Sequence, residues 1–301
     1  MPTDHAVEIA GVAISHPDRV LFPETGLTKR GLAEFYLGIA DRILPHIVNR
    51  PLTVVRCPEG ESGECFYQKH PPDGSAAYLR RLEIEDGDGR GIFFAINSLQ
   101  GLIYLVQNGT LEFHPWGCRA DRPGYPDRLI FDLDPDPAVP WKQVVAAAGQ
   151  VHERLTALGL VSFLKTTGGK GLHIVVPLVR QRPWEEVREF ARACAVRMQA
   201  EHPETFTLAM PKDRRHGRIF LDYFRNSRGA MTVATYSTRA QAGAPVSTPV
   251  AWQELTPALK SNSFTVENLP ARLAALKREP WVGFEKVRQR ITERMRRDLS
   301  G

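Results

Sequence analysis

Two aspartates at the end of an apolar run constrain this chain more than any other feature. Leu129-Ile130-Phe131 predicts a core strand, and Asp132 and Asp134 follow it with one leucine between them. In a strand, side chains at i and i+2 point to the same face. Two carboxylates at that range repel each other unless positive charge lies nearby. Mg²⁺ and Mn²⁺ prefer oxygen ligands and are often shared with substrate phosphates, so the pattern predicts a two-metal site for phosphoryl or nucleotidyl transfer.

A third aspartate, Asp222, ends a second apolar run, Ile219-Phe220-Leu221. The pattern between the two runs predicts helices over 140–159 and 183–200 and strands over 162–166 and 172–178, with a further strand over 231–235. The order β-α-β-β-α-β is typical of the split βαβ, or RRM-like, sandwich. We expect the outer strands by sequence to become its central pair, which would place Asp222 beside Asp132. The alternative is that Asp-Leu-Asp-Pro is only a polar strand end that leads into a turn.

The remaining pattern predicts an α+β arrangement within one domain, residues 1–301. Its expected submodules are an N-terminal mixed α/β module (1–120), a catalytic RRM-like module (121–260) and a helical extension (261–301). In the first module we expect helices over 28–46, capped by Thr28 and closed by Pro45, and over 98–106. We expect strands there over 52–56, 79–85, 91–96 and 110–114. In the tail, an arginine-rich helix is expected over 286–299.

The composition excludes some classes of protein and leaves others open. No run of about 18 apolar residues exists, so no membrane span is expected. The N-terminal residues lack the pattern of a secretory signal. The four cysteines, Cys57, Cys65, Cys118 and Cys194, form no Cys-x-x-Cys pair, so neither structural zinc nor a disulfide is expected and a reducing cytosol fits. A net charge of +5 permits a polyanionic partner, although an arginine-rich proteome would also explain it.

A glycine-rich loop, Gly168-Gly169-Lys170-Gly171, lies between two expected strands. Glycines let main-chain N–H groups approach an anion closely, and Thr167 and Lys170 add a hydroxyl and a charge. His173 could bind a phosphate or orient a metal-bound oxygen. The loop does not fit the Walker A pattern. The alternative is an ordinary hairpin loop.

Basic residues follow the loop in sequence. Arg215 and Arg239 are the two that we expect to clamp a triphosphate, because arginine binds phosphate oxygens in a bidentate manner. The roles of Arg214, Arg218, Arg225 and Arg228 stay open.

Three further positions lie in the first module. Phe66 belongs to the mixed aromatic and cationic stretch 66–70, in which aromatic faces could stack on bases or simply fill the core. His114 by default is a structural histidine with its hydrogen bonds satisfied. Arg19 and Lys29 flank the start of the helix expected from Thr28, where an anion such as a 5′-phosphate would be favoured.

These motifs together resemble the polymerase domain of bacterial ATP-dependent DNA ligase D, in the archaeo-eukaryotic primase superfamily. The resemblance rests on residues 131–135, 165–173, 221–226 and 236–239. Further matching motifs are Arg50-Pro51-Leu52-Thr53, Arg56-Cys57-Pro58, residues 66–70, Glu112-Phe113-His114-Pro115-Trp116 and Pro249-Val250-Ala251-Trp252. The resemblance extends from about residue 15 to about residue 274, and it implies a primase-like fold.

The resemblance implies a repair polymerase of non-homologous end joining that prefers Mn²⁺, favours ribonucleotides and releases pyrophosphate. Such domains fill templated gaps, extend ends without a template and recognise a downstream 5′-phosphate. It implies Asp132, Asp134 and Asp222 as catalytic metal ligands. The implied nucleotide-binding residues are Phe66, His114, Thr167, Lys170, His173, Arg215 and Arg239, and the implied 5′-phosphate ligands are Arg19 and Lys29.

The resemblance also implies partners and a location. The partners are gapped or broken DNA, nucleoside triphosphates, ligase and phosphoesterase domains of a longer protein, and an end-binding protein. The location is the bacterial cytoplasm, at the nucleoid. Thr167 departs from the serine usual in the family, and Arg19 from lysine. The chain has no Lys-x-Asp-Gly ligase motif, so it is either a stand-alone polymerase or one domain of a longer protein.

Two other functions compete with this interpretation. A metal-dependent nuclease or phosphodiesterase would use the same carboxylates on water, but it does not need the basic residues Lys170, Arg215 and Arg239. A non-catalytic module that binds DNA ends would ignore nucleotides. Three convergent aspartates argue against the second alternative, because acidic groups weaken binding to a phosphate backbone.

Overall fold

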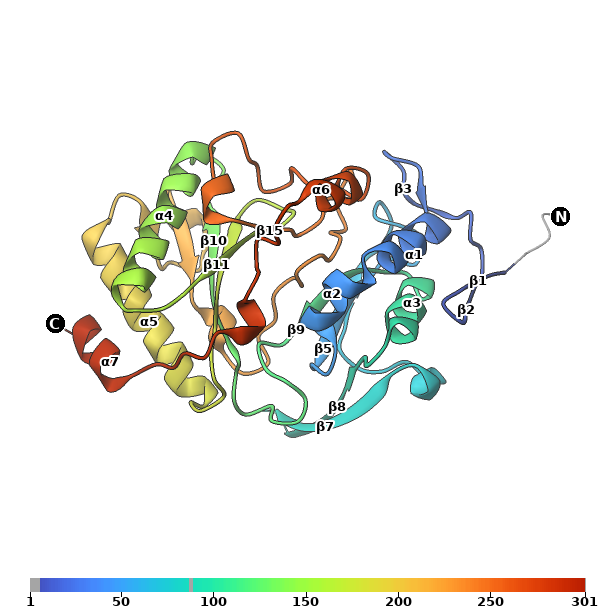
Figure 1. Cartoon of the computed structure of the whole chain (residues 1–301), viewed down its shortest axis with the longest axis horizontal. Helices are drawn as coiled ribbons and strands as arrows, with labels where there is room; N and C mark the ends of the chain where they lie inside the picture. The colour runs from blue at the N-terminus through green and yellow to red at the C-terminus, as the bar shows by residue number, and fades with distance from the viewer. Residues whose placement is uncertain (1–5, 87–88, 301) are drawn as a thin grey trace. The chain divides into compact units, whose positions relative to one another are not determined.

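The computed structural model describes residues 6–86 and 89–300 of the chain. It contains two compact units, each assembled from three segments of sequence (Figure 1). Unit 1 comprises the described residues up to Trp116, together with Met231–Ser247 and Phe264–Leu276. Unit 2 comprises Gly117–Ala230, Thr248–Ser263 and the described residues from Lys277 onward. The expected mixture of helices and strands is confirmed, while the submodule boundaries at residues 120 and 260 stay a prediction.

Unit 2 is built on a six-stranded sheet in the order β13-β14-β10-β12-β11-β15. The pairs within it are antiparallel except β13 with β14, which is parallel. The strand bounds are β10 Arg128–Pro135, β11 Phe163–Thr166, β12 Leu172–Pro177, β13 Phe206–Thr207, β14 Ile219–Asp222 and β15 Pro249–Val250.

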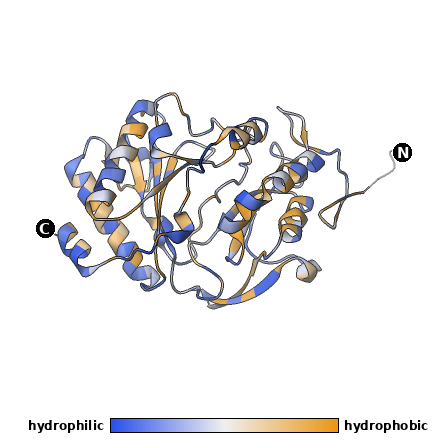
Figure 2. Cartoon of the chain, in the orientation of Figure 1, coloured by the Kyte–Doolittle hydropathy of each residue, from blue (hydrophilic) through white to orange (hydrophobic). Residues whose placement is uncertain are grey.

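Alternation along β10 separates an apolar face from a face that becomes polar. Leu129, Phe131 and Leu133 are at most 1% exposed and share one face. The helices α4 (Trp141–Ala157) and α5 (Trp184–Glu201) lie on the same side of this sheet in Figure 1. Both helices carry hydrophobic and hydrophilic residues, whereas the sheet strands are mostly hydrophobic (Figure 2). An amphipathic helix of this kind buries its apolar stripe on a sheet.

The other face of β10 changes character along its length. Near its start, Ile130 packs in a small cluster with Phe163, Val175, Trp281 and Phe284. The same face continues to Asp132 and Asp134 by the two-residue period of a strand. The carboxylates therefore lie where the apolar cover of this face ends.

The expected adjacency of the two aspartate strands is confirmed. In the antiparallel ladder of β10 with β14, Asp132 is directly opposite Asp222. The expectation that these two strands form the central pair is wrong, because the central pair of the sheet is β10 and β12. β14 lies on the outer side of β10 and is itself flanked by β13, which the sequence pattern did not reveal.

Unit 1 contains a sheet in the order β6-β5-β8-β7, with β9 also paired to β5. Two small hairpins, β1 with β2 and β3 with β4, accompany it. The strand bounds are β1 Val7–Ile9, β2 Val12–Ile14, β3 Val20–Phe22, β4 Leu27–Thr28, β5 Leu52–Arg56, β6 Phe66–Gln68, β7 Arg80–Asp86, β8 Gly89–Ala95 and β9 Thr110–Pro115. The expected turn between β7 and β8 includes residues 87–88, which lie outside the described residues.

The single helix expected over 28–46 is two helices, α1 (Lys29–Gly38) and α2 (Ala40–Ile47). The Thr28 cap is confirmed, because its hydroxyl accepts a hydrogen bond from the Gly31 N–H at 3.1 Å. Pro45 does not close the helix but lies inside α2. The break is at Ile39, whose ψ of 19° departs from helical values. The other cap expected in this unit, Ser98 at the start of α3 (Leu99–Gln107), is also confirmed.

Two of the predictions for the C-terminal half of the chain, a strand over 231–235 and a helix over 286–299, are wrong. Residues 231–235 form no strand, since Met231 makes only an isolated bridge with Trp116 and the chain turns at Tyr236, whose φ is +69°. The helix expected over 286–299 is confined to α7 (Glu293–Ser300). The segment before it is held extended, because the Val179 N–H donates to the Gln289 carbonyl at 2.9 Å. The tail also contains α6 (Leu269–Ala275), in unit 1.

The expectation of no disulfide is wrong as well. Cys57 and Cys65 are bonded, whereas Cys118 and Cys194 are free and buried. The reason is the register of the hairpin: Arg56 is opposite Phe66 in the β5–β6 ladder, so the residues just beyond them meet. Separation along the sequence concealed this proximity.

None of the helices in the described part of the chain is long and apolar enough to cross a lipid bilayer.

The Tyr36 hydroxyl anchors α1 to a distant segment of unit 1. It lies 2.8 Å from the Thr238 hydroxyl and accepts a hydrogen bond from the Thr238 N–H at 2.9 Å, and both residues are fully buried. Replacing Tyr36 with phenylalanine would remove the acceptor of the buried Thr238 N–H, whereas the Thr238 hydroxyl would keep its hydrogen bond to the Leu111 carbonyl. We expect Tyr36→Phe to lower the free energy of unfolding by about 1–3 kcal/mol, measured by urea denaturation. Tyr67→Phe, at a side chain 65% exposed, is the control and should change stability little.

Candidate active site

A pair of carboxylates on neighbouring strands forms the centre of the polar face in unit 2. Asp132 is 9% exposed and Asp222 7% exposed. The turn that follows β14 brings Arg225 over them, and its Nε atom lies 3.1 Å from an oxygen of each carboxylate. The Arg225 side chain is 41% exposed, so this cation is reachable from solvent. Because both carboxylates face the same cation, this point of the sheet favours a positively charged group.

Asp134, two residues farther along β10, has a cation of its own. The Arg215 guanidinium donates to its carboxylate at 2.5 Å. Arg215 also stacks 4.4 Å from the ring centroid of Phe220, the residue directly opposite Asp134 in the ladder. Each of the three aspartates therefore has an arginine, Arg215 or Arg225, as an ion-pair partner.

His173 completes this group from the other neighbouring strand. It is opposite Asp132 in the β10–β12 ladder, and its Nε2 atom lies 3.4 Å from the Asp132 carboxylate. Burial lowers the pKa of His173 to about 4, although the Asp132 charge opposes the shift. At neutral pH the imidazole is uncharged, so it can position a carboxylate or an oxygen without adding positive charge.

The two paired aspartates have opposite pKa shifts. Burial raises the pKa of Asp132, but His173 and Arg225 outweigh it and hold the pKa below the ordinary aspartate value. Burial also raises the pKa of Asp222, and there it prevails over the opposing effect of Arg225. The Asp132 charge adds to that rise, as expected for like charges at close range. Additional positive charge at this point would favour ionisation of both groups.

Asn226 fixes the turn that carries Arg225. Its side chain is 1% exposed and replaces a strand partner for β10, because its amide oxygen accepts from the Ile130 N–H and its amide nitrogen donates to the Ile130 carbonyl, both at 2.8 Å. The sequence analysis missed this role. The signal for it was weak, because an asparagine shortly after a strand is also common in ordinary turns.

The glycine-rich loop is packed directly against the backbone between the two β10 aspartates. A Cβ atom on Gly171 would lie 2.0 Å from the Leu133 carbonyl oxygen, so only glycine fits there. The Thr167 hydroxyl is engaged inside the loop: it donates to the Gly171 carbonyl at 3.0 Å and accepts from the Gly169 and Gly171 N–H groups, each at 3.2 Å. Lys170 is exposed at the tip. The structure thus brings loop and carboxylates together, as the sequence predicted.

The donor chemistry of this face fits divalent cations. Carboxylate oxygens are the ligands that Mg²⁺ and Mn²⁺ prefer, and the Arg225 guanidinium already draws Asp132 and Asp222 toward one cation. Among the described residues, no group of three His, Cys, Asp or Glu side chains has the spacing of a metal site. Asp134 is paired with Arg215 in this structure, and its charge still adds to the rise in the pKa of Asp222.

Two of the expected nucleotide-binding residues share a buried acid in unit 1. His114 Nε2 and Arg239 Nε lie 2.7 and 3.0 Å from the same oxygen of Glu112, whose other oxygen accepts from the Ala240 N–H at 2.8 Å. Burial raises the pKa of Glu112, but the hydrogen bond from His114 and the charge of Arg239 outweigh it and lower the pKa to about 2. The sequence analysis named Glu112 only as part of a matching motif and gave it no role. Its position two residues before His114 in a strand was the available signal.

The remaining expected residues lie elsewhere in unit 1. Phe66 is 43% exposed, beside the Arg56 guanidinium at 5.5 Å, so it is not a core residue. Arg19 is paired with Glu59 at 3.3 Å and donates to the Pro58 carbonyl. Lys29 is 6% exposed and donates to the Ser15 carbonyl at 2.9 Å. The main chains of Arg19 and Lys29 are also joined, by a 2.9 Å hydrogen bond.

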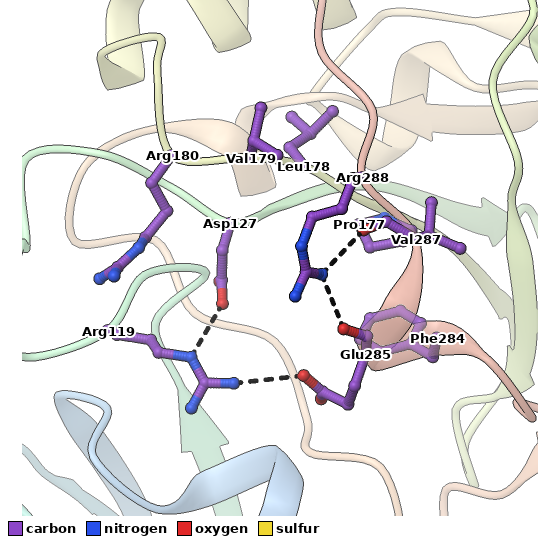
Figure 3. Close-up of a pocket in the computed structure, with 10 residues that line it drawn as sticks. All are labelled: Arg119, Asp127, Pro177, Leu178, Val179, Arg180, Phe284, Glu285, Val287 and Arg288. Atoms are coloured by element: carbon purple, nitrogen blue, oxygen red, sulfur yellow. Dashed lines mark hydrogen bonds and ion pairs between the residues drawn. The ribbon is translucent and has the colours of Figure 1, made fainter.

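A separate cavity of about 320 Å³ lies in unit 2 at the start of β10, beyond the opposite end of the strand from the aspartates (Figure 3). Arg119 spans it between Asp127 at 3.3 Å and Glu285 at 3.4 Å, and Arg288 donates to main-chain carbonyls. Three arginines and two acidic residues line this cavity, and the third arginine, Arg180, is paired with Asp121 outside the lining. The charged groups around the cavity therefore form a structural ion-pair network.

Comparisons with known proteins agree with the geometry. The family described as "LigD, primase-polymerase domain" matches residues 28–281. The chain belongs to this family. A solved structure, the polymerase domain from Mycobacterium tuberculosis ligase D in complex with DNA, is similar with a TM-score of 0.83 and 33% sequence identity. That match covers 87% of this chain and 94% of the other.

Curated relatives of this LigD family member are longer proteins. The multifunctional non-homologous end joining protein LigD of Pseudomonas aeruginosa is 43% identical over 96% of this chain, and the match covers 35% of the relative. The LigD protein of Mycolicibacterium smegmatis is 34% identical over 81% of the chain and 32% of its own length. The chain thus spans about a third of the length of these relatives. LigD polymerase domains form a family of metal-dependent nucleotidyltransferases.

The contact of Gly171 with β10 predicts that a single added methyl group damages the site. We expect Gly171→Ala to reduce primer extension by roughly a hundredfold, because the loop or the aspartate strand must shift by about an ångström. Far-UV circular dichroism should show a retained fold. Gly149→Ala, in the middle of α4, is the matched control, because the added Cβ would meet nothing within 4 Å beyond its chain neighbours and the backbone of its own helix. The control should keep full activity and gain up to about 1 kcal/mol of stability. Wild-type activity in Gly171→Ala would contradict the packing argument.

Proposed function

We propose that this chain is a DNA repair polymerase of non-homologous end joining. It adds ribonucleotides or deoxyribonucleotides to DNA 3′ ends, fills templated gaps, extends ends without a template and recognises a downstream 5′-phosphate. The single observation that carries the proposal is the direct pairing of Asp132 with Asp222, two buried carboxylates that share a cation beside the glycine loop. Family membership and the DNA-bound neighbour support it.

In this proposal Asp132, Asp134 and Asp222 hold two Mn²⁺ or Mg²⁺ ions. Bound there, such ions supply charge that activates the attacking 3′-hydroxyl and neutralises the triphosphate and departing pyrophosphate. Neutral His173 orients Asp132, and its burial keeps water from competing for that carboxylate. Arg225 offsets the repulsion between Asp132 and Asp222.

The nucleotide and the DNA are assigned to basic and aromatic groups. Lys170, Arg215 and Arg239 neutralise the triphosphate, and Glu112 holds His114 and Arg239 in fixed orientations near the nucleotide. Exposed Phe66 stacks on a base. Thr167 contributes to triphosphate binding indirectly, because its hydroxyl holds the glycine-rich loop in shape. Arg19 and Lys29 bind the 5′-phosphate.

The proposed setting follows from the relatives. They are named as multifunctional proteins of end joining, and the chain spans about a third of their length. We therefore propose ligase and phosphoesterase domains and an end-binding protein as its partners, in the bacterial cytoplasm at the nucleoid. A nuclease acting on water remains the competing function, and it predicts shortening rather than lengthening of a primer.

Primer extension with aspartate variants tests the catalytic assignment. Asp132→Asn and Asp222→Asn remove one charge each at nearly constant volume. We expect each to lower the extension rate by more than the roughly 10- to 100-fold typical of outer-shell metal partners. Affinity for gapped DNA, measured by fluorescence anisotropy, should change little. Asp298→Asn, at a side chain 54% exposed and paired weakly with Arg294, is the control. A wild-type rate in either site variant would remove that residue from the mechanism.

Binding to gapped DNA tests the 5′-phosphate assignment. Lys29→Ala should weaken binding to a gap with a 5′-phosphate by about tenfold, the effect of one charged hydrogen bond, and leave binding to an unphosphorylated gap nearly unchanged. Arg30→Ala, the next basic residue on the same helix, pairs with Asp18 and should not discriminate between the two gaps. Equal losses on both gaps in Lys29→Ala would place the phosphate elsewhere.

A further inference from the structure

The glycine-rich loop has a partner outside itself, Ser261, which no sequence motif revealed. Ser261 belongs to the segment Thr248–Ser263 of unit 2 and is 5% exposed. Its carbonyl accepts from the Gly168 N–H at 2.9 Å, and its hydroxyl donates to the Gly169 carbonyl. One residue thus binds both glycines that precede Lys170.

These contacts use up nearly every main-chain donor of the loop. Thr167 N–H donates to the Gly171 carbonyl, Gly168 N–H to Ser261, and the N–H groups of Gly169 and Gly171 to the Thr167 hydroxyl. In the described part of the chain, only the Lys170 N–H of this loop has no acceptor. The loop is not an open row of glycine donors. Its one uncommitted main-chain N–H in the described part of the chain belongs to Lys170, which is exposed.

The residues on both sides of Lys170 are held by contacts outside the loop. On one side, Gly171 abuts the Leu133 carbonyl between the β10 aspartates. On the other side, Ser261 holds Gly168, which has a φ of +69°, and Gly169. With three glycines around Lys170, the chain has little intrinsic preference for one conformation. The Ser261 contacts supply that preference.

The turn that carries Ser261 is itself anchored. The indole N–H of Trp141, the first residue of α4, donates to the Leu259 carbonyl. The Lys260 N–H donates to the Ser263 hydroxyl at 2.7 Å, and the Lys260 ammonium lies 6.0 Å from the Trp141 ring centroid. A hydroxyl on an anchored turn can orient a flexible loop at low entropic cost.

We propose that Ser261 is a positioning residue for the phosphates of the nucleotide. It acts through the Gly168-Gly169 backbone, and it fixes the Lys170 N–H and ammonium in the orientation that binds the triphosphate. This inference rests on the proposed function, because it assigns a support to the same nucleotide site.

The test compares Ser261→Ala and Ser261→Cys with Thr256→Ala, which removes an exposed hydroxyl from the same segment. Steady-state primer extension should show a nucleotide KM raised about three- to tenfold in both Ser261 variants, the effect of one lost hydrogen bond, with kcat within about twofold. The cysteine variant keeps the volume but is a weak donor, so it should resemble the alanine variant. Thr256→Ala should match wild type.

Hydrogen exchange provides a readout that does not depend on activity. Without nucleotide, amides of residues 168–171 should exchange faster in both Ser261 variants than in wild type or Thr256→Ala. Recovery of wild-type KM and exchange by cysteine would show that Ser261 only fills space and would overturn the proposal, as would an unchanged KM in the alanine variant. Absence of nucleotide-dependent extension by the wild type would instead overturn the proposed function.

Discussion

The antiparallel register of β10 with β14 is the constraint on which the candidate site depends. It sets Asp132 directly opposite Asp222, so two acids meet at the edge of an apolar face where water is scarce. Such a pair is tolerated only with positive charge close by. Arg225 supplies that charge and Asn226 holds its turn against β10. A slip of one residue in this register would turn Asp222 to the opposite face and leave Asp132 without its companion.

Close backbone contacts also position the rest of the site. Strand β12 sets His173 opposite Asp132, and the loop that precedes it returns so closely that Gly171 admits no side chain. The Thr167 hydroxyl and the turn that carries Ser261 then accept hydrogen bonds from most of the main-chain N–H groups of the loop. The site therefore combines rigid acids on strands with a loop whose flexibility is restricted by neighbours rather than by its own sequence.

Patterns with a local cause could be predicted from the sequence, and contacts between distant segments could not. The i and i+2 spacing placed Asp132 and Asp134 on one face, and the caps at Thr28 and Ser98 followed from hydroxyls before apolar runs. The break at Ile39 and the extended segment around Gln289 depend on tertiary partners, which override helical periodicity. The Cys57–Cys65 bond required the hairpin register, and the roles of Glu112, Asn226 and Ser261 depend on which distant segments fold against them.

The way the two units share the chain has a consequence for dissecting the protein. The polypeptide passes between them five times, after Trp116, Ala230, Ser247, Ser263 and Leu276. Neither unit is a continuous stretch that can be cloned alone, and the continuous fragment 117–230, which carries the aspartate strands, would lack both β15 and the turn with Ser261. Deleting segments of the chain would therefore disturb folding as well as catalysis. Point substitutions are the suitable way to dissect the site in this topology.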